Sequence, residues 1–448
     1  KTPWYIAAFA MVGAAISGVT FISVPGSVAA DGFSYMQMVV GFTIGQLIVA
    51  FVLIPVFYRQ GVVSLYEYLD KRFNLAAQRT GAWLFFISKL LSASLRAFVI
   101  CAVLQGLLYE RWGVPFWINA MIMMGLVWLY TRRGGVRAVV WVEMVKTILM
   151  VSSIVLCIAF VIKALGLNIG EALTTIHQSD YSQILFLDNP LDRRYFWKQF
   201  IAGIFLVVAM TGLDQDMMQT MLSCRNQRDS QRSMIQSIMV QVVVIALFLA
   251  LGALLYTFID SRGLSIERGD DLFGFVATEC GLPAIVGIAF LLGLVASTYS
   301  SAGSALTALT TSFTIDILGA NRRHDSSTTE GSEAISTVRR RVHILIAVAM
   351  CGVIMIFGSW SSMGVITLIF TMASYTYGPL LGMFAFGLLS KRSVRGWAMP
   401  VVALASPTIS YLIATHSQAW LGGYTFSYEI LIVNAALSML GLWAFSRK

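Results

Sequence analysis

The chain has 448 residues, of which 58% are hydrophobic and only 12% are charged, and its mean hydropathy is +0.77. A soluble domain needs about 25% charged residues, so this composition excludes a soluble globular protein. The formal net charge of +9 would also suit a nucleic-acid-binding protein. The distribution of the basic residues along the sequence distinguishes that alternative from a membrane protein. We expect an all-α, polytopic membrane protein.

Apolar stretches long enough to cross a hydrocarbon core of about 30 Å recur from one end of the sequence to the other. The polar segment 319–338 is typical of a flexible linker. The apolar stretches predict about twelve membrane spans, near residues 4–24, 36–58, 80–108, 115–130, 138–163, 197–222, 234–259, 283–317, 342–359, 363–389, 396–415 and 426–446.

Basic residues gather in alternate loops between the predicted spans, which is the pattern of cytoplasmic loops. Membrane topology therefore explains the positive charge, and nucleic-acid binding is not needed. The same pattern puts the Lys1 end and the C-terminus in the cytoplasm. Examples of the basic groups are Arg132, Arg133 and Arg137, then Arg225, Arg228 and Arg232, and then Arg339, Arg340 and Arg341.

The residue types of most metal centres and hydrolytic sites do not form a pattern in this sequence. The five cysteines and four histidines are scattered singly, without C-x-x-C or His-Glu-x-x-His spacing. We infer neither a disulfide framework nor a transition-metal site. No Ser/His/Asp or paired-aspartate arrangement occupies matching spans, so we expect no enzymatic activity.

A stripe of hydroxyls lies within the predicted eighth span, in the sequence STYSSAGSALTALTTSFTID (297–316). Serines and threonines recur there at steps of three and four, which puts them on one face of a helix. One interpretation is helix packing, because small residues allow close approach and hydroxyls bond to backbone carbonyls. The other is a site for a hard cation with oxygen ligands, which the adjacent pair Ser300 and Ser301 favours.

Two spans contain helix-breaking signals at corresponding positions. In the first, GAAISGVTFISVPG (13–26), Ser17-Gly18 interrupts the helix, and in the sixth, AMTGLDQDMMQ (209–219), Gly212 lies close to Asp214. Transporters place binding sites at such breaks. The correspondence predicts two inverted repeats of five spans. The predicted units are residues 1–165 for the first repeat, 166–196 for an extracytoplasmic loop, 197–389 for the second repeat and 390–448 for two further helices.

Charged residues within spans are candidates for function, since each costs about 2.5–3.5 kcal/mol on insertion scales. Arg96 has two interpretations of equal weight: it is an ion-pair partner of Asp214 or Asp216, or a fork for a substrate carboxylate. Lys89 lies seven residues earlier on the same face. We interpret it as a snorkelling anchor or as an internal ion-pair partner.

Six segments, in this order, resemble the sodium:solute symporter family, whose members include sodium/glucose, sodium/proline and sodium/sialic acid transporters. The resemblance covers nearly the whole chain and implies the leucine-transporter-like inverted repeat, with the first and sixth helices broken. The segments are PWYIAAFAMVGAAISGVTFISVPG (3–26), SLYEYLDKRFN (64–74), LYTRRGGVRAVVWVEMVKT (129–147), GLDQDMMQTMLSCRN (212–226), SSAGSALTALTTSFTIDIL (300–318) and YGPLLGMFAFGLLSKRSVRGWAMP (377–400).

The resemblance also implies roles for particular residues, with Na⁺ as the coupling ion. Its main sodium site corresponds to the carbonyls of Gly13, Ile16 and Ser297 and the hydroxyls of Ser300 and Ser301. Its substrate-facing positions correspond to Ser17, Thr20, Arg96, Asp214 and Gln215.

The sequence departs from the family in three places. Many members have one more helix before the segment that matches Pro3-Trp4. A second cation site would use Glu143, Lys146 and Ser304, but Glu143 replaces the usual aspartate, and Gly303 stands where a hydroxyl is expected. Glu143 and Lys146 are one turn apart and can neutralise each other. We hypothesise that Lys146 takes the charge role of the second cation, leaving one Na⁺ per substrate.

The function we expect is a sodium-coupled symporter of the bacterial inner membrane that imports a small polar solute by alternating access. Arg96 favours a carboxylate such as sialic acid or another sugar acid, whereas Ser17, Thr20 and Asp214 suit a sugar or polyol equally well. A proton-coupled carrier using Glu143 or Asp214, and a sensor that binds solute without transport, remain alternatives. The expected partners are the solute, Na⁺ and the lipid bilayer, without nucleic acid or an obligate protein partner.

Overall fold

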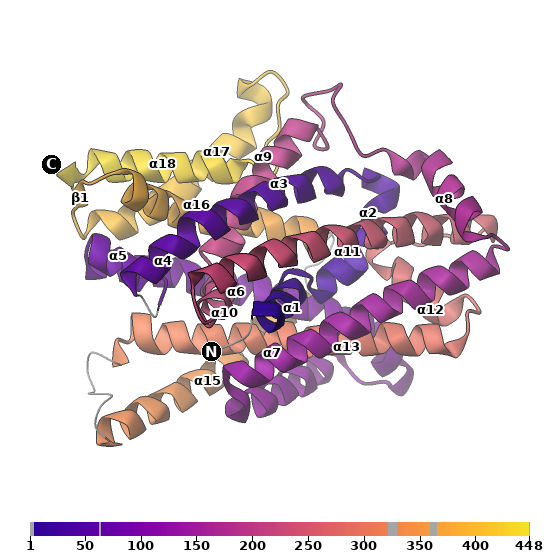
Figure 1. Ribbon diagram of the computed structural model, residues 1–448, viewed down its shortest axis with the longest axis horizontal. Helices are drawn as coiled ribbons and strands as arrows, with labels where there is room; N and C mark the ends of the chain where they lie inside the picture. Colours follow the sequence, from indigo (N-terminus) through magenta and orange to yellow (C-terminus); the bar gives the residue numbers. More distant parts are fainter. Residues whose placement is uncertain (1–3, 62–63, 321–328, 359–364, 448) are drawn as a thin grey trace.

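The computed structural model of the chain describes residues 4–61, 64–320, 329–358 and 365–447 (Figure 1). These residues are almost entirely helical, as expected from the composition. Their strands are the short pair β1 (Ser393–Val394) and β2 (Ser446–Arg447), which are antiparallel. The predicted cytoplasmic ends, Lys1 and Lys448, lie outside the described residues.

The first half of the chain forms long helices joined by short turns. Its helices are α1 (Trp4–Ala15), α2 (Gly18–Asp31), α3 (Tyr35–Ile48), α4 (Ile54–Gln60), α5 (Glu67–Arg72), α6 (Leu75–Leu104), α7 (Phe116–Ala164) and α8 (Ile169–Gln178). Short π-helical or 3₁₀ segments are η1 (Val49–Leu53), η2 (Gln105–Tyr109), η3 (Glu110–Trp112) and η4 (Asp180–Ser182).

The second half has the same character. Its helices are α9 (Phe196–Val207), α10 (Gln215–Leu222), α11 (Gln227–Ser261), α12 (Leu272–Glu279), α13 (Ala284–Ser312), α15 (Thr329–Gly358), α16 (Val365–Leu389), α17 (Ala398–Trp420) and α18 (Ile430–Ala444). Short segments are η5 (Val208–Gly212), η6 (Gly269–Asp271) and η7 (Phe313–Ile317).

The helix breaks at the first predicted position. Helix α1 ends at Ala15 and α2 begins at Gly18, with a bend of 51° between them. Ser17 has extended backbone and is the N-cap of α2, where its hydroxyl accepts from the backbone N–H of Thr20. A serine at this position supplies the acceptor that the first turn of α2 lacks, so the local sequence explains the new helix start.

The second predicted break has the same cause. Segment η5 ends at Gly212, α10 begins at Gln215, and the helix directions differ by 67°. Asp214 has extended backbone, and its carboxylate accepts from the backbone N–H of Asp216 at 2.9 Å. Aspartate is among the strongest N-cap residues. Capping of α10 therefore fixes the Asp214 side chain at the break.

The number of spans differs from the twelve predicted. By length and apolar composition, 8 helices of the described residues could cross a membrane, or up to 10 if each bent pair counts as one span. Helix α18 has only 15 residues, and the predicted spans 115–130 and 138–163 both fall within α7, which has 49 residues. The number twelve therefore stays a prediction.

The predicted linker 319–338 is partly wrong, because α15 already begins at Thr329. The helix therefore carries the basic group Arg339 to Arg341 on regular helical turns instead of on a loop. In Figure 1, α5, β1 and the first turns of α15 lie at one end of the molecule, and α8 lies at the opposite end. This arrangement agrees with the alternate distribution of basic loops.

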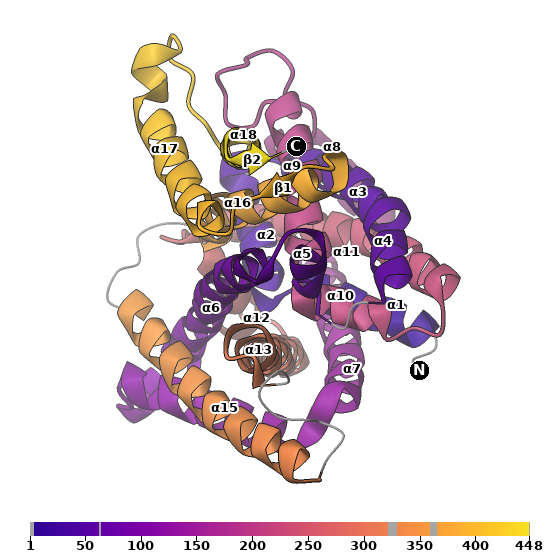
Figure 2. The same ribbon diagram turned by 90° about the vertical axis from the view of Figure 1, so that its left-hand side faces the viewer.

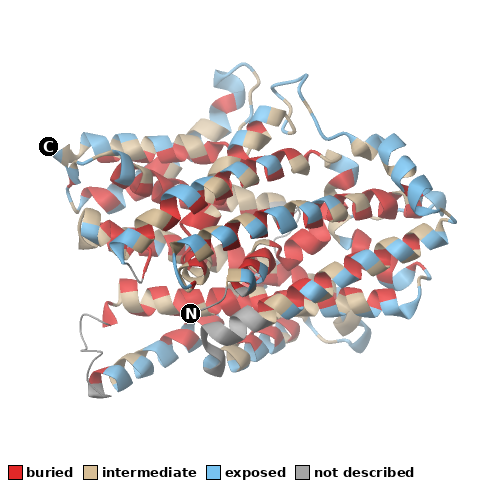
Figure 3. Ribbon diagram, in the orientation of Figure 1, coloured by how far each residue is buried: buried red, intermediate tan, exposed pale blue. Residues whose placement is uncertain are grey.

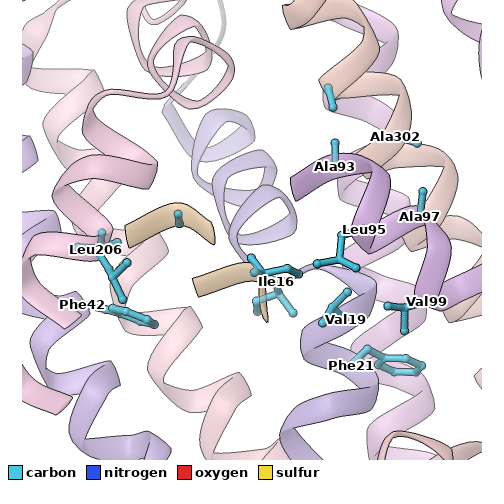
Figure 4. Packing of buried hydrophobic residues seen from close by; sticks show 14 of the residues in the cluster. Ile16, Val19, Phe21, Phe42, Ala93, Leu95, Ala97, Val99, Leu206 and Ala302 are labelled. Carbon is cyan, nitrogen blue, oxygen red and sulfur yellow. The ribbon is translucent and has the colours of Figure 1, made fainter. Parts of the chain in front are cut away.

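The end-on view in Figure 2 shows α13, the helix with the hydroxyl stripe, surrounded by α6, α7 and α15. Burial is higher along the inner helix α13 than on the outer faces of helices such as α15 (Figure 3). Several large apolar residues of the outer faces, such as Leu345, Val348 and Leu404, are exposed, as expected for surfaces that contact lipid. The broken first span packs on α6, with Ile16 and Val19 facing Leu95 (Figure 4).

Candidate functional site

A cavity lies where the two broken spans meet α6. Four of the five predicted substrate residues line it: Ser17 and Thr20 from the first break, Arg96 from α6, and Asp214 from the second break. Lys89 also lines it. The remaining walls are partly aromatic and include Tyr35, Phe42, Phe370 and Tyr377. Apolar walls with a few converging polar groups are typical of a site for a small organic solute.

The fifth predicted substrate residue, Gln215, does not line this cavity. Its side chain is buried, and its Oε1 accepts from the backbone N–H of Leu65 at 2.7 Å. Tyr66, the next residue, donates its hydroxyl to the carbonyl of Leu213 at 3.0 Å. Gln215 thus helps to fasten the segment before α5 to the second break.

The cluster around Asp214 joins charged groups of α6 and the start of α10 to hydroxyls of α13 and α16. Lys89 Nζ lies 2.9 Å from Asp214 Oδ2 and 3.2 Å from Asp216 Oδ2. Tyr377 donates its hydroxyl to Asp214 Oδ2 at 3.1 Å, and Ser304 donates to Asp216 Oδ2 at 2.5 Å. We call these five residues the Asp214 cluster. Lys89 is therefore an ion-pair partner in the structure and not a snorkelling anchor.

Arg96 stands beside this cluster without joining it. Among the described residues, no carboxylate lies within 4.0 Å of its guanidinium, and its Nε is buried without a hydrogen-bond partner. Lys89 already occupies the position next to Asp214 that one interpretation gave to Arg96. The structure therefore leaves the guanidinium facing the cavity with unused donors, and an unpaired buried donor is costly until a ligand satisfies it.

A second set of buried charges lies between α1, α7 and α13. Lys146 Nζ is 2.6 Å from Glu143 Oε2, and the Lys146 side chain is completely buried. Ser300 donates its hydroxyl to the other carboxylate oxygen of Glu143. We call these three residues the Glu143 cluster. The predicted main sodium site and the predicted second cation site therefore meet at one carboxylate, which the sequence could not show.

Gly13 lets the first span approach this carboxylate. A Cβ atom on Gly13 would lie 2.6 Å from Glu143 Oε2 and 2.9 Å from the backbone carbonyl oxygen of Glu143. Both distances are too short for a carbon atom, so only glycine fits at this position in the close packing of α1 against α7. The contact brings the predicted ligand Gly13 next to the Glu143 cluster.

The other predicted sodium ligands are near the same place. Ser297 is completely buried, and its hydroxyl has no hydrogen-bond partner among the described residues. Ser301 lines a small cavity together with Glu143, Asp216 and Ser304. Hydroxyl and carboxylate oxygens therefore converge between α13 and the two breaks, although no group of three or more His, Cys, Asp or Glu forms a metal cluster within the described residues.

The sequence analysis missed the roles of two cavity residues. Asp216 was considered only as a possible ion-pair partner of Arg96, whereas in the structure it joins Lys89 to Ser304. Tyr377 begins a recognised segment, but no spacing rule connects it with Asp214, which lies 163 residues earlier. Asp216, the second acidic residue of GLDQD, was at least visible as a charge in the sequence, whereas Tyr377 carried no such signal.

A second, outer pocket adjoins the main cavity and shares Tyr35 and Phe370 with it. Arg193, Arg194 and Asp31 also line this outer pocket. Arg193 pairs with Asp31, and Arg194 pairs with Asp192 at 2.9 Å. The hydrogen bond from Arg194 holds the pKa of Asp192 below its ordinary value. Both arginines of the outer pocket are therefore engaged in ion pairs.

Residues 2–402 match the model of the sodium:solute symporter family, and the chain belongs to this family. Its members are secondary transporters and not enzymes. Among curated relatives, the chain is 25% identical over 391 residues to sodium-coupled monocarboxylate transporter 1 of Xenopus laevis, covering 85% of this chain and 60% of that protein. It is 23% identical over 386 residues to the human sodium/iodide cotransporter, covering 83% and 57%. The chain thus spans about 60% of the length of these relatives.

Solved structures support the fold. A Na⁺-coupled sialic acid symporter in a substrate-bound outward-open state has a TM-score of 0.81 at 19% identity, covering 99% of this chain and 89% of that chain. Mhp1, a nucleobase-cation-symport-1 family transporter in a closed conformation, has a TM-score of 0.61 at 13% identity, covering 99% and 92%. The predicted leucine-transporter-like fold is confirmed at this level.

Proposed function

We propose that this protein is a sodium-coupled symporter that imports a small organic carboxylate, such as a sugar acid, by alternating access. The observation that carries the proposal is the unpaired guanidinium of Arg96 in the cavity between the two broken spans. A guanidinium offers two parallel N–H donors that match a carboxylate. Such a charge-assisted, bidentate pairing is stronger than any single hydroxyl contact.

The charges around the cavity explain why a cation would accompany the substrate. Lys89 and Arg96 carry two positive charges, and Asp214 and Asp216 carry two negative charges, so the empty cavity is neutral. A monovalent carboxylate adds one uncompensated negative charge. Burying a net charge is expensive in a low-dielectric interior, so binding of one Na⁺ nearby favours binding of the anion.

We propose that Na⁺ binds between the first break and α13, at the carbonyls of Gly13, Ile16 and Ser297 and the hydroxyls of Ser300 and Ser301. The proposal is supported by the contact of Ser300 with Glu143 and by the buried, unpartnered hydroxyl of Ser297. Oxygen ligands of this kind suit a hard cation. Glu143 and Ser304 could bind a second Na⁺ only if the ammonium of Lys146 moved away from Glu143. We therefore propose one Na⁺ per substrate.

This stoichiometry has an energetic consequence. One Na⁺ with one monovalent carboxylate carries no net charge, so only the sodium gradient drives uptake, and a tenfold gradient supplies about 1.4 kcal/mol. A second Na⁺ would make transport electrogenic and add about 2.3 kcal/mol for each 100 mV of membrane potential. Accumulation of the solute should therefore respond to the sodium gradient and not to the membrane potential.

The hydroxyl groups of a sugar acid also have partners in the cavity. Ser17 and Thr20 line it, as do Gln46 and Gln241, which bond to each other at 2.9 Å. These neutral groups would equally accept a sugar or a polyol, which is the second candidate substrate class. Proton coupling is less well supported, because Glu143 and Asp214 each already have a lysine as counter-charge.

We also propose the arrangement in the membrane from the sequence pattern. Residues 1–165 and 197–389 form the two repeats, 166–196 forms an extracytoplasmic loop, and 390–448 adds the last helices. The basic loops then face the cytoplasm, and the outer pocket with Arg193 and Arg194 faces the opposite side.

Uptake into proteoliposomes tests the proposal. Vesicles containing the protein receive a mixed pool of monocarboxylates, sugar acids, sugars and polyols under an inward Na⁺ gradient, with an equal K⁺ gradient as control, and mass spectrometry identifies what enters. Sodium-dependent uptake of carboxylates supports the proposal. Uptake of neutral sugars alone would overturn the carboxylate class, and solute binding without uptake would indicate a sensor.

A further inference from the structure

A third cavity lies between α7, α13 and α15, apart from both charge clusters. Three arginines line it, Arg132 from α7 and Arg339 and Arg340 from α15, together with Thr307 and Thr310 of α13. Figure 2 shows the three helices around this region, with α15 on the outside and α13 on the inside. The cavity belongs to the end of the molecule where the basic loops gather.

Within the part of the chain that the structure describes, no acidic group compensates the positive charges of this cavity. No carboxylate is among its lining residues, and among the described residues none of the three arginines has an acidic group within 4.0 Å. Arg132 stacks on the ring of Trp128, at 5.2 Å from its centroid. Three like charges that converge on one hollow repel one another, and this arrangement is stabilised by an anion between them.

The remaining lining groups are hydrogen-bonding groups. The hydroxyls of Thr307, Thr310 and Ser336 line the cavity, and so does His343, whose Nε2 lies 3.0 Å from the hydroxyl of Thr131. A guanidinium donates two parallel hydrogen bonds, and the hydroxyls add further donors. This set of donors matches the several oxygens of a phosphate group better than it matches a chloride ion, which is a single atom.

We propose that this cavity binds a phosphate group, and that this group anchors α15 to α7 and α13. Two sources share this chemistry: the headgroup of an anionic phospholipid, and soluble phosphate. Ile344 lines the cavity and is exposed, and so are its neighbour Leu345 and, one turn further along α15, Val348. Basic pockets between membrane helices on the cytoplasmic side bind anionic lipid headgroups, with the acyl chains on such apolar surfaces.

The test uses the purified full chain, delipidated in a neutral detergent. Native mass spectrometry measures the affinity for phosphatidylglycerol, with phosphatidylcholine as reference lipid, and thermal unfolding measures stabilisation by inorganic phosphate against chloride at equal ionic strength. The cavity variant is R132Q/R339Q/R340Q. The matched control is R228Q/R232Q/R341Q, which removes the same charge from arginines that are exposed like those of the cavity but do not line it.

We expect the cavity variant to bind phosphatidylglycerol at least about tenfold more weakly, since one guanidinium near an anionic headgroup contributes about a factor of five, and the control variant to bind as the wild type does. Loss of stabilisation by inorganic phosphate in the cavity variant alone would identify soluble phosphate as the source. Equal losses in both variants, or no preference for either phosphate ligand in the wild type, would overturn the proposal. If the triple variant does not fold, R340Q against R341Q makes the same comparison.

Discussion

The Glu143 cluster and the Asp214 cluster both bury a lysine against carboxylates, but they differ in how completely the charges are paired. In the Glu143 cluster, one lysine faces one carboxylate, and Lys146 is completely buried. In the Asp214 cluster, one lysine serves two aspartates at the edge of a cavity, and Arg96 stands beside them without an ion pair.

The difference indicates which cluster is structural in the resting protein and which is open to a ligand. A fully paired buried ion pair gains nothing from further partners and resists disruption, because removing one partner leaves an uncompensated charge. An arginine with unused donors gains from a ligand that satisfies them. Pairing, and not burial alone, therefore separates the cavity that we expect to hold the solute from the Glu143 cluster, in which we expect Lys146 to take the charge role of a second cation.

The largest effect should come from unbalancing the Glu143 cluster. Lys146→Met leaves Glu143 buried without its counter-charge, which typically costs about 3–5 kcal/mol of stability. If a cation can replace the ammonium, Na⁺ should restore much of this loss and K⁺ should not. Thermal unfolding in detergent with either salt measures this.

The double variant Glu143→Gln with Lys146→Met is its control, since it removes both charges and should be more stable than Lys146→Met alone. A sodium Hill coefficient near two for the wild type, reduced to one by Glu143→Ala, would contradict the role of Lys146 as the resident cation.

The next largest effect should come from the unpaired arginine. Arg96→Ala removes the fork for the carboxylate, and we expect kcat/KM for sodium-driven carboxylate uptake to fall about a hundredfold, which corresponds to about 2.7 kcal/mol. Arg96→Lys keeps the charge but loses the bidentate geometry, so its kcat/KM should lie between those of the wild type and Arg96→Ala. Unchanged KM for carboxylates in Arg96→Ala would refute the assignment.

A smaller effect is expected at the hydroxyl pair. Ser300→Ala with Ser301→Ala removes two proposed sodium ligands at about 1 kcal/mol each, which should raise the half-saturating Na⁺ concentration about thirtyfold. At working Na⁺ concentrations the stimulation by Na⁺ should then disappear. Thr310→Ala, on the same helix but bonded to the carbonyl of Leu306, is the matched control. Unaltered sodium dependence of the double variant would exclude this site.

The smallest effect on transport is expected at Gln215, which lies outside the cavity. Gln215→Ala should leave the KM for the solute within about twofold, while the lost hydrogen bond to the backbone of Leu65 lowers stability by about 1 kcal/mol. Uptake kinetics together with thermal unfolding separate the two contributions. A large rise in KM without loss of stability would return Gln215 to the substrate site.

Local patterns in the sequence were sufficient for part of the site. Composition defined the membrane class, Ser17 and Asp214 marked the starts of new helices at the two breaks, and the spacing of the serines defined one face of α13. Each of these features depends on neighbours within a few turns, where N-capping and helical periodicity operate.

Other expectations failed because they depend on contacts between distant segments. The linker 319–338 was predicted from polarity alone, yet α15 starts at Thr329 and its basic residues face a cavity that α7 and α13 complete. Gln215 was carried over to the substrate site by position in a motif, but its orientation at the break directs it toward Leu65.

The sequence by itself determined that the chain crosses the membrane many times, that two spans are interrupted, and that a few charges are buried within them. Only the tertiary structure decided which charges meet: Lys89 and not Arg96 pairs with Asp214, and Ser300 contacts Glu143. The physical reason is that periodicity tells which face of its own helix a residue occupies, whereas an ion pair or a binding cavity depends on distances between helices, which only their packing fixes.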